Sequence, residues 1–376
     1  MKPTNCRTIN YINSIPIKVW VLAPSVETLD DNLDYYYDFS QSIAEYEIVF
    51  AELNIAWQWQ PVTLLNFKEI IHSINQEKNL NQFFPVVLNL CDGDEINNTP
   101  GISVVRLLEK YELVFTGADE FFYEITTSKI SMKKAFDKFG VSTAKWKAIN
   151  NKQHNYDDIF EQLGTPLIVK PSVSGGSMGV GTKNVIDNKI DLQIQVDTIF
   201  SGYRGWNLVG DGVIAESFIN GPEYTVLIVG SFDKPEEAII YNPVERVFHA
   251  SLPEHEKFLS FDRLWEIYED ETEMPNQENF FEYGKVDVAL EDKIKKISWD
   301  AYVAVRGTGY TRIDLRCDKN TGSMYVLEVN AQCGISNDED FTSIGAILKL
   351  SGNKFTDLVK EIILNALRRK NIQLND

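Results

Sequence analysis

Apolar residues in the first third of the chain recur in short runs that alternate with segments of helical spacing. The runs over 15–23 and 84–90 are almost continuous, as is typical of strands that are buried in a parallel sheet. Strands are expected over 15–23, 56–59, 84–90 and 113–117, and helices over 38–54, 67–75 and 100–111. This alternation predicts an N-terminal parallel α/β domain over residues 1–117.

The first domain boundary is expected near residue 117, and over 213–242 strands follow strands, which predicts an antiparallel sheet in this later part of the chain. Ser128 and Gly140 are expected to cap a helix between them. Further helices are predicted over 146–164, 191–200 and 292–305, and strands over 167–170, 182–186, 213–219, 223–229, 238–242, 311–317 and 325–330. The acidic, aromatic segment 251–288 is too long for an ordinary connection and is predicted to be a lid or a mobile insertion.

A glycine-rich loop follows the strand that ends in Lys170, with four glycines within residues 175–181. The nucleophile elbow of hydrolases does not fit, because no helix is expected directly after the loop. The dinucleotide-binding spacing and the Walker lysine are absent too. We therefore predict a hairpin whose tip covers phosphates, with Lys170 as a point charge at its base. A plain mobile loop is the alternative.

Two alternating strands near the C-terminus carry a second candidate site. Arg312 and Asp314 share one face of the first strand, and Glu328 and Asn330 share a face of the second. If these faces coincide, their oxygens suit Mg²⁺, which prefers few protein ligands together with phosphate oxygens. Arg312 would then stabilise charge on a phosphoryl group. The alternative is an ordinary solvated hairpin.

Asp92 and Lys129 are candidates of lower specificity. Asp92 follows the buried strand 84–90 at the carboxyl end, where open α/β sheets bind ligands, although Asp-Gly also forms ordinary turns. Lys129 lies in the first turn of a predicted helix, where the helix dipole disfavours a cation. An anionic ligand would explain its position, and so would exposure to solvent.

The balance of 36 basic and 55 acidic residues gives a net charge of −19, which disfavours nucleic acid and anionic membranes as partners. The 4 cysteines are far apart and form no C-x-x-C pair, so neither a disulfide framework nor a zinc site is expected. No apolar run approaches the roughly 18 residues of a membrane span, and the N-terminus is polar. We expect a cytoplasmic protein.

Taken in order, these motifs resemble the ATP-grasp superfamily, and most closely the D-alanine–D-alanine ligase family with its carboxylate–amine ligase relatives. The resemblance covers nearly the whole chain. It rests on Phe115 to Gly117, Lys129, Leu167 to Ser172, Gly175 to Gly179, Gly221 to Thr225, Arg312 to Asp314 and Leu327 to Asn330. It implies an α/β (α+β) ATP-grasp fold, in which the N-terminal domain precedes two domains, 118–214 and 215–376, whose antiparallel sheets sandwich ATP.

The resemblance also implies roles for individual residues. Lys129 and Lys170 would contact ATP phosphates, beneath a loop formed by Gly175, Gly176, Ser177, Met178 and Gly179. The adenine pocket would comprise Glu216, Phe218, Ile219 and Leu327, and Glu223 would hold the ribose. Asp314, Glu328 and Asn330 would bind two Mg²⁺ ions, or Mn²⁺ in their place. Arg312 would support the acyl phosphate, with Lys170 and Ser177 as the other catalytic residues.

The residues expected at the substrates depart from the family pattern. Asp38 aligns loosely with the N-terminal glutamate of the family, and Asp92 replaces its histidine. The lid lysine of the family is missing, with Arg263 nearby. Gly334 and Ser343 lie in a longer, acidic segment that is expected to receive the second substrate. That acidity hints at a cationic substrate, and a solvated loop is an equal alternative.

These features predict an ATP- and Mg²⁺-dependent carboxylate–amine ligase that joins an amino acid or similar carboxylate to an amine in specialised biosynthesis. The expected partners are a small-molecule carboxylate and a small-molecule amine, with neither nucleic acid nor a membrane. A homodimer is expected. One alternative is a D-alanine–D-alanine ligase of peptidoglycan synthesis, and another is a regulatory ATP-binding protein without catalysis. Cys333 is not expected to act as a nucleophile, because no motif ties any histidine to it.

Overall fold

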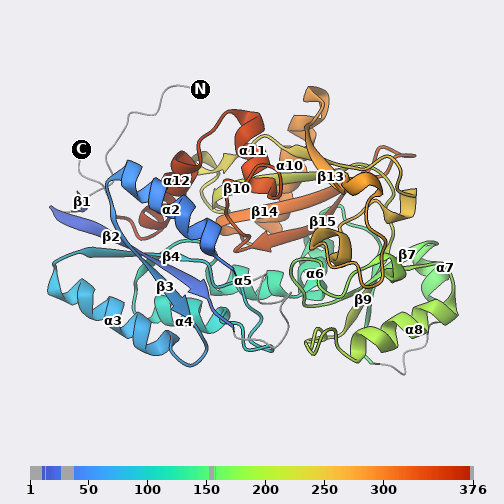
Figure 1. Ribbon diagram of the computed structural model, residues 1–376, viewed down its shortest axis with the longest axis horizontal. Helices are drawn as coiled ribbons and strands as arrows, with labels where there is room; N and C mark the ends of the chain where they lie inside the picture. Colours follow the sequence, from blue (N-terminus) through green and yellow to red (C-terminus); the bar gives the residue numbers. More distant parts are fainter. Residues whose placement is uncertain (1–10, 13, 27–37, 152–155, 157, 373–376) are drawn as a thin grey trace.

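The computed structural model describes residues 11–12, 14–26, 38–151, 156 and 158–372, and its strands form three sheets (Figure 1). In the N-terminal sheet, β3 (Ala56–Val62), β2 (Ile15–Pro24), β4 (Phe84–Asn89) and β5 (Val114–Phe115) are parallel neighbours in that order. The short β1 (Tyr11–Ile12) pairs antiparallel with β2. The predicted parallel α/β domain is present.

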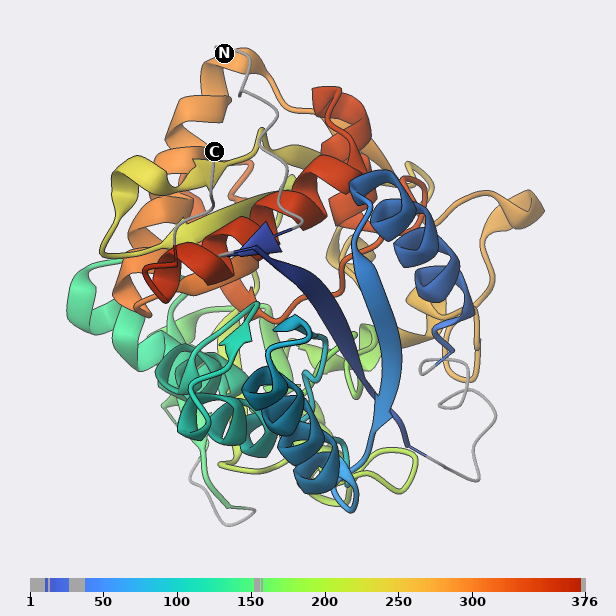
Figure 2. The ribbon, with the colours of Figure 1, turned by 90° about the vertical axis from the view of Figure 1, so that its left-hand side faces the viewer.

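Side chains alternate between the two faces of this sheet, so that each face meets its own helices. Trp20 and Leu22 pack with α3 (Phe67–Leu80) and α4 (Ile102–Lys110). Val19 and Val21 pack with α2 (Ser40–Leu53) and with α12 (Phe355–Arg369), which returns from the C-terminal end of the chain. Figure 2 shows this helix, in red, beside the blue strands of the sheet. The N-terminal domain is thereby fixed to the C-terminal domain.

The central sheet is antiparallel, in the order β6 (Trp146–Ile149), β9 (Val213–Ser217), β7 (Leu167–Pro171) and β8 (Val185–Ile186). Helices α7 (Ile159–Leu163) and α8 (Lys189–Phe200) pack on this sheet. Helices α5 (Glu120–Thr127) and α6 (Lys129–Phe139) pack instead against the C-terminal sheet. As predicted, the hydroxyl of Ser128 caps α6, accepting from the backbone of Ser131 at 3.2 Å.

The C-terminal sheet has the order β13 (Phe281–Lys285), β12 (Val244–Phe248), β10 (Glu223–Ser231), β14 (Thr308–Cys317) and β15 (Met324–Ala331), with β11 (Ile239–Ile240) also on β10. All its pairs are antiparallel. Helix α10 (Val288–Ala304) packs on one face, against Val226, Ile228 and Ile313. On the other face, α11 (Ser343–Ser351) and α12 cover one end of β10, beside Leu227 and Val229.

Two local predictions were wrong. The expected helix over 146–164 is strand β6 followed, within the described residues, by the short α7. The segment 182–186 begins with a 3₁₀ turn (Thr182–Asn184) before β8. Helix α5 was not predicted from the sequence. Strands β9 and β10, which are separated by the turn at 220–222, belong to different sheets.

The expected boundary between residues 214 and 215 falls inside β9, so the chain passes from the central to the C-terminal sheet over 218–222. The predicted lid or insertion over 251–288 contains α9 (Phe261–Leu264) between turns and ends with strand β13; its part before β13, residues 251–280, is named the lid segment below. Other 3₁₀ turns are Pro235–Glu237, Glu254–Glu256 and Pro275–Gln277. Within the ranges that the structure describes, no helix is both long enough and apolar enough to span a membrane.

Candidate active site

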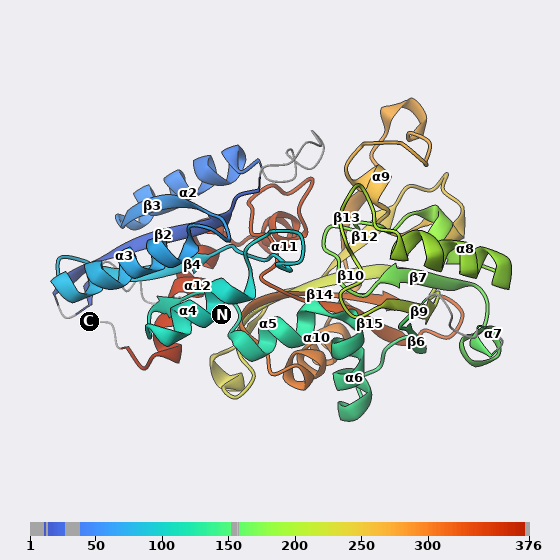
Figure 3. The same ribbon diagram turned by 90° about the horizontal axis from the view of Figure 1, so that it is seen from below.

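A cavity of about 590 Å³ lies where the three parts of the chain meet. Central strand β7 and C-terminal strands β14 and β15 contribute Lys170, Arg312 and Glu328 to its lining, and the loop after β4 contributes Asp92. The segment between α6 and β6 joins the C-terminal sheet where the backbone N–H of Val326, on β15, donates to the carbonyl of Ser142 at 2.9 Å. Figure 3 shows β7 and β9 beside β14 and β15.

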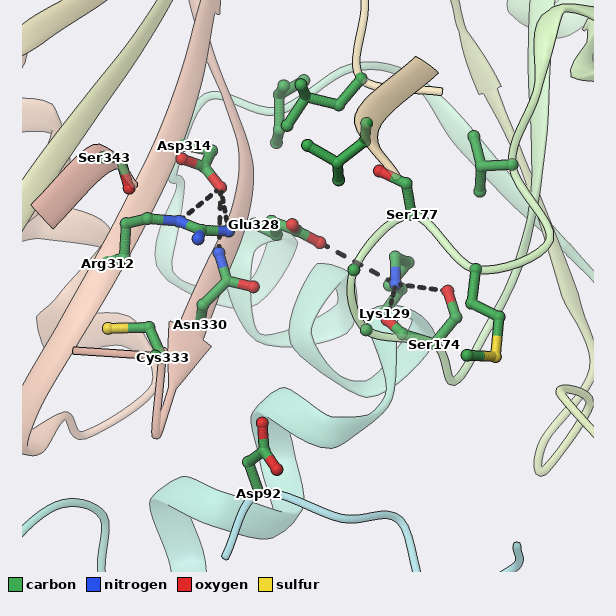
Figure 4. Close-up of a pocket in the computed structure, with 18 of the residues that line it drawn as sticks. Asp92, Lys129, Ser174, Ser177, Arg312, Asp314, Glu328, Asn330, Cys333 and Ser343 are labelled. Carbon is green, nitrogen blue, oxygen red and sulfur yellow. Dashed lines mark hydrogen bonds and ion pairs between the residues drawn. The ribbon is translucent and has the colours of Figure 1, made fainter. Parts of the chain in front are cut away.

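Strand pairing brings the four polar residues of the C-terminal hairpin together. Arg312 is directly opposite Asn330, and Asp314 is directly opposite Glu328. Opposed residues of an antiparallel pair point to the same face, so all four side chains face the cavity. Figure 4 shows Arg312 and Asn330 both turned toward Asp314. The two faces therefore coincide, as the predicted site requires.

Asp314 is the centre of this group. Its Oδ2 accepts from Arg312 Nε at 3.1 Å and from Asn330 Nδ2 at 3.0 Å, and its Oδ1 accepts from Thr225 Oγ1 at 2.8 Å. Burial alone would lower the pKa of Arg312, but Asp314, Cys333 and Glu328 together outweigh burial and raise it. Arg312 is therefore a fixed cation at the edge of the cavity.

The donor set of this hairpin fits magnesium. Because the amide nitrogen of Asn330 donates to Asp314, its amide oxygen is the atom available to a cation. With the Asp314 and Glu328 carboxylates, it gives three oxygen donors on one face. The described residues contain no cluster of three or more His, Cys, Asp or Glu side chains that could hold a metal alone. A small protein ligand set completed by phosphate oxygens is what Mg²⁺ prefers.

Three lysines line or adjoin the cavity beside the glycine-rich loop. Glu216 bridges two of them, with Oε1 2.7 Å from Lys133 Nζ and Oε2 3.0 Å from Lys170 Nζ. Burial would raise the pKa of Glu216, but the two lysines outweigh burial and lower it to about 2. Lys129 donates to the carbonyl of Ser174 at 2.9 Å and lies 3.8 Å from Glu328 (Figure 4). The first turn of α6 thus holds a cation beside the glycine-rich loop.

The glycine-rich loop closes over the cavity as a hairpin between β7 and β8. Ser177 and Gly179 both have left-handed backbones, with φ of 61° and 74°. Met178 is buried against Leu208 and Phe261, which fixes the tip to the lid segment. The indole N–H of Trp265 in that segment also donates to the carbonyl of Gly176 at 2.9 Å.

The residues expected around the nucleoside all line the cavity, namely Glu216, Phe218, Ile219, Glu223 and Leu327. The carboxylates among them already have partners. Glu216 holds the two lysines, and buried Glu223 accepts from Arg246 Nη1 and, at 2.9 Å, from Arg316 Nη2. These arginines position the carboxylate that is expected at the ribose.

The residues expected at the substrates are only partly brought together. Asp92, Gly334 and Ser343 line the cavity with Arg312. Asp92 is exposed to the open cavity, yet the surrounding protein raises its pKa to about 6, with Asp94 adding to the effect. Ser343 begins α11 on the same side as Arg312 (Figure 4).

Asp38 and Arg263 are not among the residues that line the cavity. Asp38 is exposed and accepts from the backbone N–H of Ser40 at 2.9 Å, which serves the start of α2. Arg263 is buried in the lid segment, with Nη2 2.7 Å from Glu256 and Nε 3.5 Å from Glu271. Its charge is used within the lid, so this geometry does not support Arg263 in place of the missing lysine.

The acidic residues of the segment after Asn330, residues 338–340, are not among those that line the cavity. The lining from this segment comes from residues 331–336 and 341–343. Asp338 accepts from the backbone N–H groups of Asp340 and Phe341 at 3.0 and 3.1 Å, so it stabilises the turn itself. The geometry favours the solvated loop over a site for a cationic substrate.

The sequence analysis missed four residues that support the site, namely Lys133, Thr225, Arg246 and Arg316. Two of them carried a usable signal. Lys133 follows Lys129 by four positions on one helix, and Arg316 continues the alternation of Arg312 and Asp314. Arg246 and Thr225 become relevant only through strand pairing.

A fold in which two antiparallel sheets enclose this cavity, with an α/β domain at its mouth, defines an ATP-grasp enzyme. The family model described as "D-ala D-ala ligase C-terminus" matches residues 135–364, and the chain belongs to this family. It is an ATP-dependent ligase that forms carbon–nitrogen bonds between small molecules.

Curated relatives and solved structures agree with this family. A D-alanine–D-alanine ligase of Nitrosococcus oceani is 25% identical over 71% of this chain and 73% of its own length. Another, of Lactobacillus gasseri, is 25% identical over 82% of this chain and 78% of its own. The solved D-alanine–D-alanine ligase of Bacillus anthracis complexed with ATP is 19% identical, with a TM-score of 0.64 over 94% of this chain and 99% of that one. This structural likeness supports the fold.

Proposed function

We propose that this enzyme joins the carboxylate of one amino acid to the amino group of a second, and that D-alanine fills both positions. The named relatives favour this alternative over the broader hypothesis of a ligase of specialised biosynthesis. The single observation that carries the ligase chemistry is the convergence of Arg312, Asp314, Glu328 and Asn330 on one face, opposite the lysines and the glycine-rich loop.

In the proposed reaction, a carboxylate first becomes an acyl phosphate, because an oxide ion is too poor a leaving group for direct attack by an amine. The γ-phosphoryl group moves to the carboxylate oxygen and ADP is left. The neutral amine then attacks the acyl carbon, phosphate departs with that oxygen, and the amine loses a proton. Positioning and charge neutralisation are the main requirements of both steps.

Named side chains meet those requirements. Lys129 and Lys170 lie at the phosphate end, and Ser177 stands at the tip of the loop above them. Asp314, Glu328 and Asn330 would hold Mg²⁺, which when bound would neutralise phosphate charge. Arg312 would stabilise the charge that develops on the transferring phosphoryl group and on the acyl centre. Glu223, held by two arginines, would accept from the ribose hydroxyls.

A second candidate is a ligase of the same chemistry for a different amino acid or amine. Its support is the substrate end of the cavity, where Asp92 lies instead of a histidine and a longer segment precedes Ser343. An aspartate is an anion at neutral pH and would attract an ammonium group rather than a neutral amine. This side chain is the one most able to change which amine enters.

The experiment that separates the candidates is phosphate release from ATP and Mg²⁺ across single and paired D- and L-amino acids, with mass spectrometry of products. D-alanine alone giving D-alanyl-D-alanine would support the first candidate. An amide from another pair, with D-alanine inactive, would support the second. ATP binding without any amide would contradict both and favour the regulatory alternative.

We also propose a homodimer in the cytoplasm as the working form, which rests on the expectation for this fold. Light scattering on purified protein should give twice the chain mass of 42.9 kDa. A mass equal to that of one chain at micromolar concentration would contradict the dimer.

A further inference from the structure

Arg246, Glu223 and Arg316 form one cross-strand row on the cavity face of the C-terminal sheet. Glu223 on β10 is opposite Arg246 on β12 and opposite Arg316 on β14. All three are buried, with 3%, 4% and 4% of Arg246, Glu223 and Arg316 exposed. Two buried guanidinium groups thus share one carboxylate.

One arginine would be enough to neutralise Glu223, and a second brings an excess buried cation at a cost in desolvation. Arg246 donates to Glu223 and has its guanidinium over the rings of Phe281 and Tyr283. Its partners all lie on the strands of its own sheet. Arg246 is therefore sufficient to hold the carboxylate, and Arg316 requires a different explanation.

Arg316 joins three segments of the chain. Its Nη2 donates to Glu223 Oε2 at 2.9 Å and also to the carbonyl of Lys257, at the base of the lid segment. Its Nη1 donates to the carbonyl of Ile219 at 3.2 Å, in the passage between the central and C-terminal sheets. The planar guanidinium fork can serve these divergent acceptors together, which a lysine cannot.

The lid segment continues from this anchor onto the central domain. Phe258, next to Lys257, packs with Ile168, Val180 and Phe218. Further along, the backbone N–H of Phe261 donates to the carbonyl of Val180 at 2.8 Å. The indole N–H of Trp265 donates to the carbonyl of Gly176, in the glycine-rich loop, at 2.9 Å. The position of the lid base therefore affects the loop over the phosphates.

We infer that Arg316 is a positioning residue that couples the ribose-binding carboxylate Glu223 to the base of the lid segment. Nucleotide that engages Glu223 then also holds the lid and the glycine-rich loop in place. This coupling rests on the proposed function for the role of Glu223.

The test compares Arg316→Met with Arg246→Met, a matched loss of one guanidinium from the same carboxylate. Each removes a charged hydrogen bond to Glu223, so we expect ADP affinity to fall roughly 10-fold or more in both. Hydrogen exchange of lid amides over 258–271 should rise only in Arg316→Met, both in unliganded protein and at saturating ADP. Arg316→Lys should restore ADP affinity more than lid protection.

Equal lid exchange in the two methionine variants, with and without ADP, would overturn the coupling. A variant counts as folded if hydrogen exchange of the β10 and β14 amides is the same as in wild type. If Arg316→Met fails this folding control, Arg316→Lys takes its place in the comparison. Failure of wild-type protein to bind ADP would instead contradict the proposed function. The comparison of unliganded variants would still decide whether Arg316 holds the lid.

Discussion

Replacing Glu216 by glutamine is the most quantitative perturbation of the site. The Glu216 carboxylate is buried and shared between Lys133 and Lys170, at 2.7 and 3.0 Å. Glutamine keeps the size of the side chain but removes the charge. Two lysines then remain near a neutral amide, and Lys133 is itself almost completely buried.

The magnitude follows from the pKa of Glu216, which the lysines lower, against the effect of burial, from 4.5 to about 2. A difference of about 2.5 pH units, at 1.36 kcal/mol per unit, corresponds to about 3 kcal/mol of stability at pH 7. This agrees with the roughly 3–5 kcal/mol lost when one partner of a buried ion pair is removed.

The sign of the pH dependence is fixed because the folded pKa lies below the unfolded value. The contribution of Glu216 is complete above pH 4.5 and is lost as the pH falls toward 2. Near pH 3 we expect roughly half of it to remain. The stability gap between wild type and Glu216→Gln should therefore narrow only below pH 4.5.

Urea unfolding of both proteins between pH 7 and pH 3 measures this gap. Glu161→Gln, an exposed carboxylate on α7, is the matched control and should change stability by less than about 0.5 kcal/mol. A gap below about 1 kcal/mol at pH 7, or one that does not narrow in acid, would refute the reasoning.

Four further predictions concern the cavity. Arg312→Ala should lower turnover by about 100-fold or more, because the charge of Arg312 acts on the transferring phosphoryl group. The affinity for ADP should be largely kept. Phosphate release measures the turnover, and calorimetry measures the ADP affinity. Although Asp92 is open to the cavity, desolvation by the surrounding protein raises its pKa from 3.8 to about 6, so its ionisation opposes folding above pH 6 and has no effect below 3.8. Asp92→Asn should therefore raise the melting temperature at pH 8 but not at pH 3.5. Burial also raises the pKa of Cys333 to about 12, so the thiol is protonated at neutral pH. Cys333→Ser should therefore retain most turnover. A covalent acyl-enzyme that mass spectrometry detects in wild type and not in Cys333→Ser would contradict this. Gly179→Ala should weaken nucleotide binding in calorimetry, because its φ is +74° and a Cβ would lie 2.9 Å from Leu208 Cδ1.

The C-terminal hairpin could be predicted because its information is local. Alternation assigns Arg312 and Asp314 to one face, and a short polar turn forces the next strand back beside the first. The pairing register, Asp314 opposite Glu328, then follows within one residue. The same reasoning applies to the cap at Ser128 and to the hairpin of the glycine-rich loop.

Pairings set by tertiary contacts could not be predicted. The turn at 220–222 resembles a hairpin turn, yet β9 pairs with β6 and β7, and β10 pairs with β12 and β14, so both edges of each strand are occupied by other partners. Arg263 is near the expected lid lysine in sequence, but Glu256 and Glu271 hold it inside the lid. Spacing along the chain carries no information about such competing partners.

The acyl phosphate is the central claim, and oxygen transfer tests it most directly. The amino acid that is active in the substrate panel, D-alanine by our proposal, would be supplied with ¹⁸O in its carboxylate, together with ATP and Mg²⁺. We predict ADP, a new amide, and released phosphate that carries one ¹⁸O atom from the carboxylate. Unlabelled phosphate, or AMP in place of ADP, would contradict the mechanism.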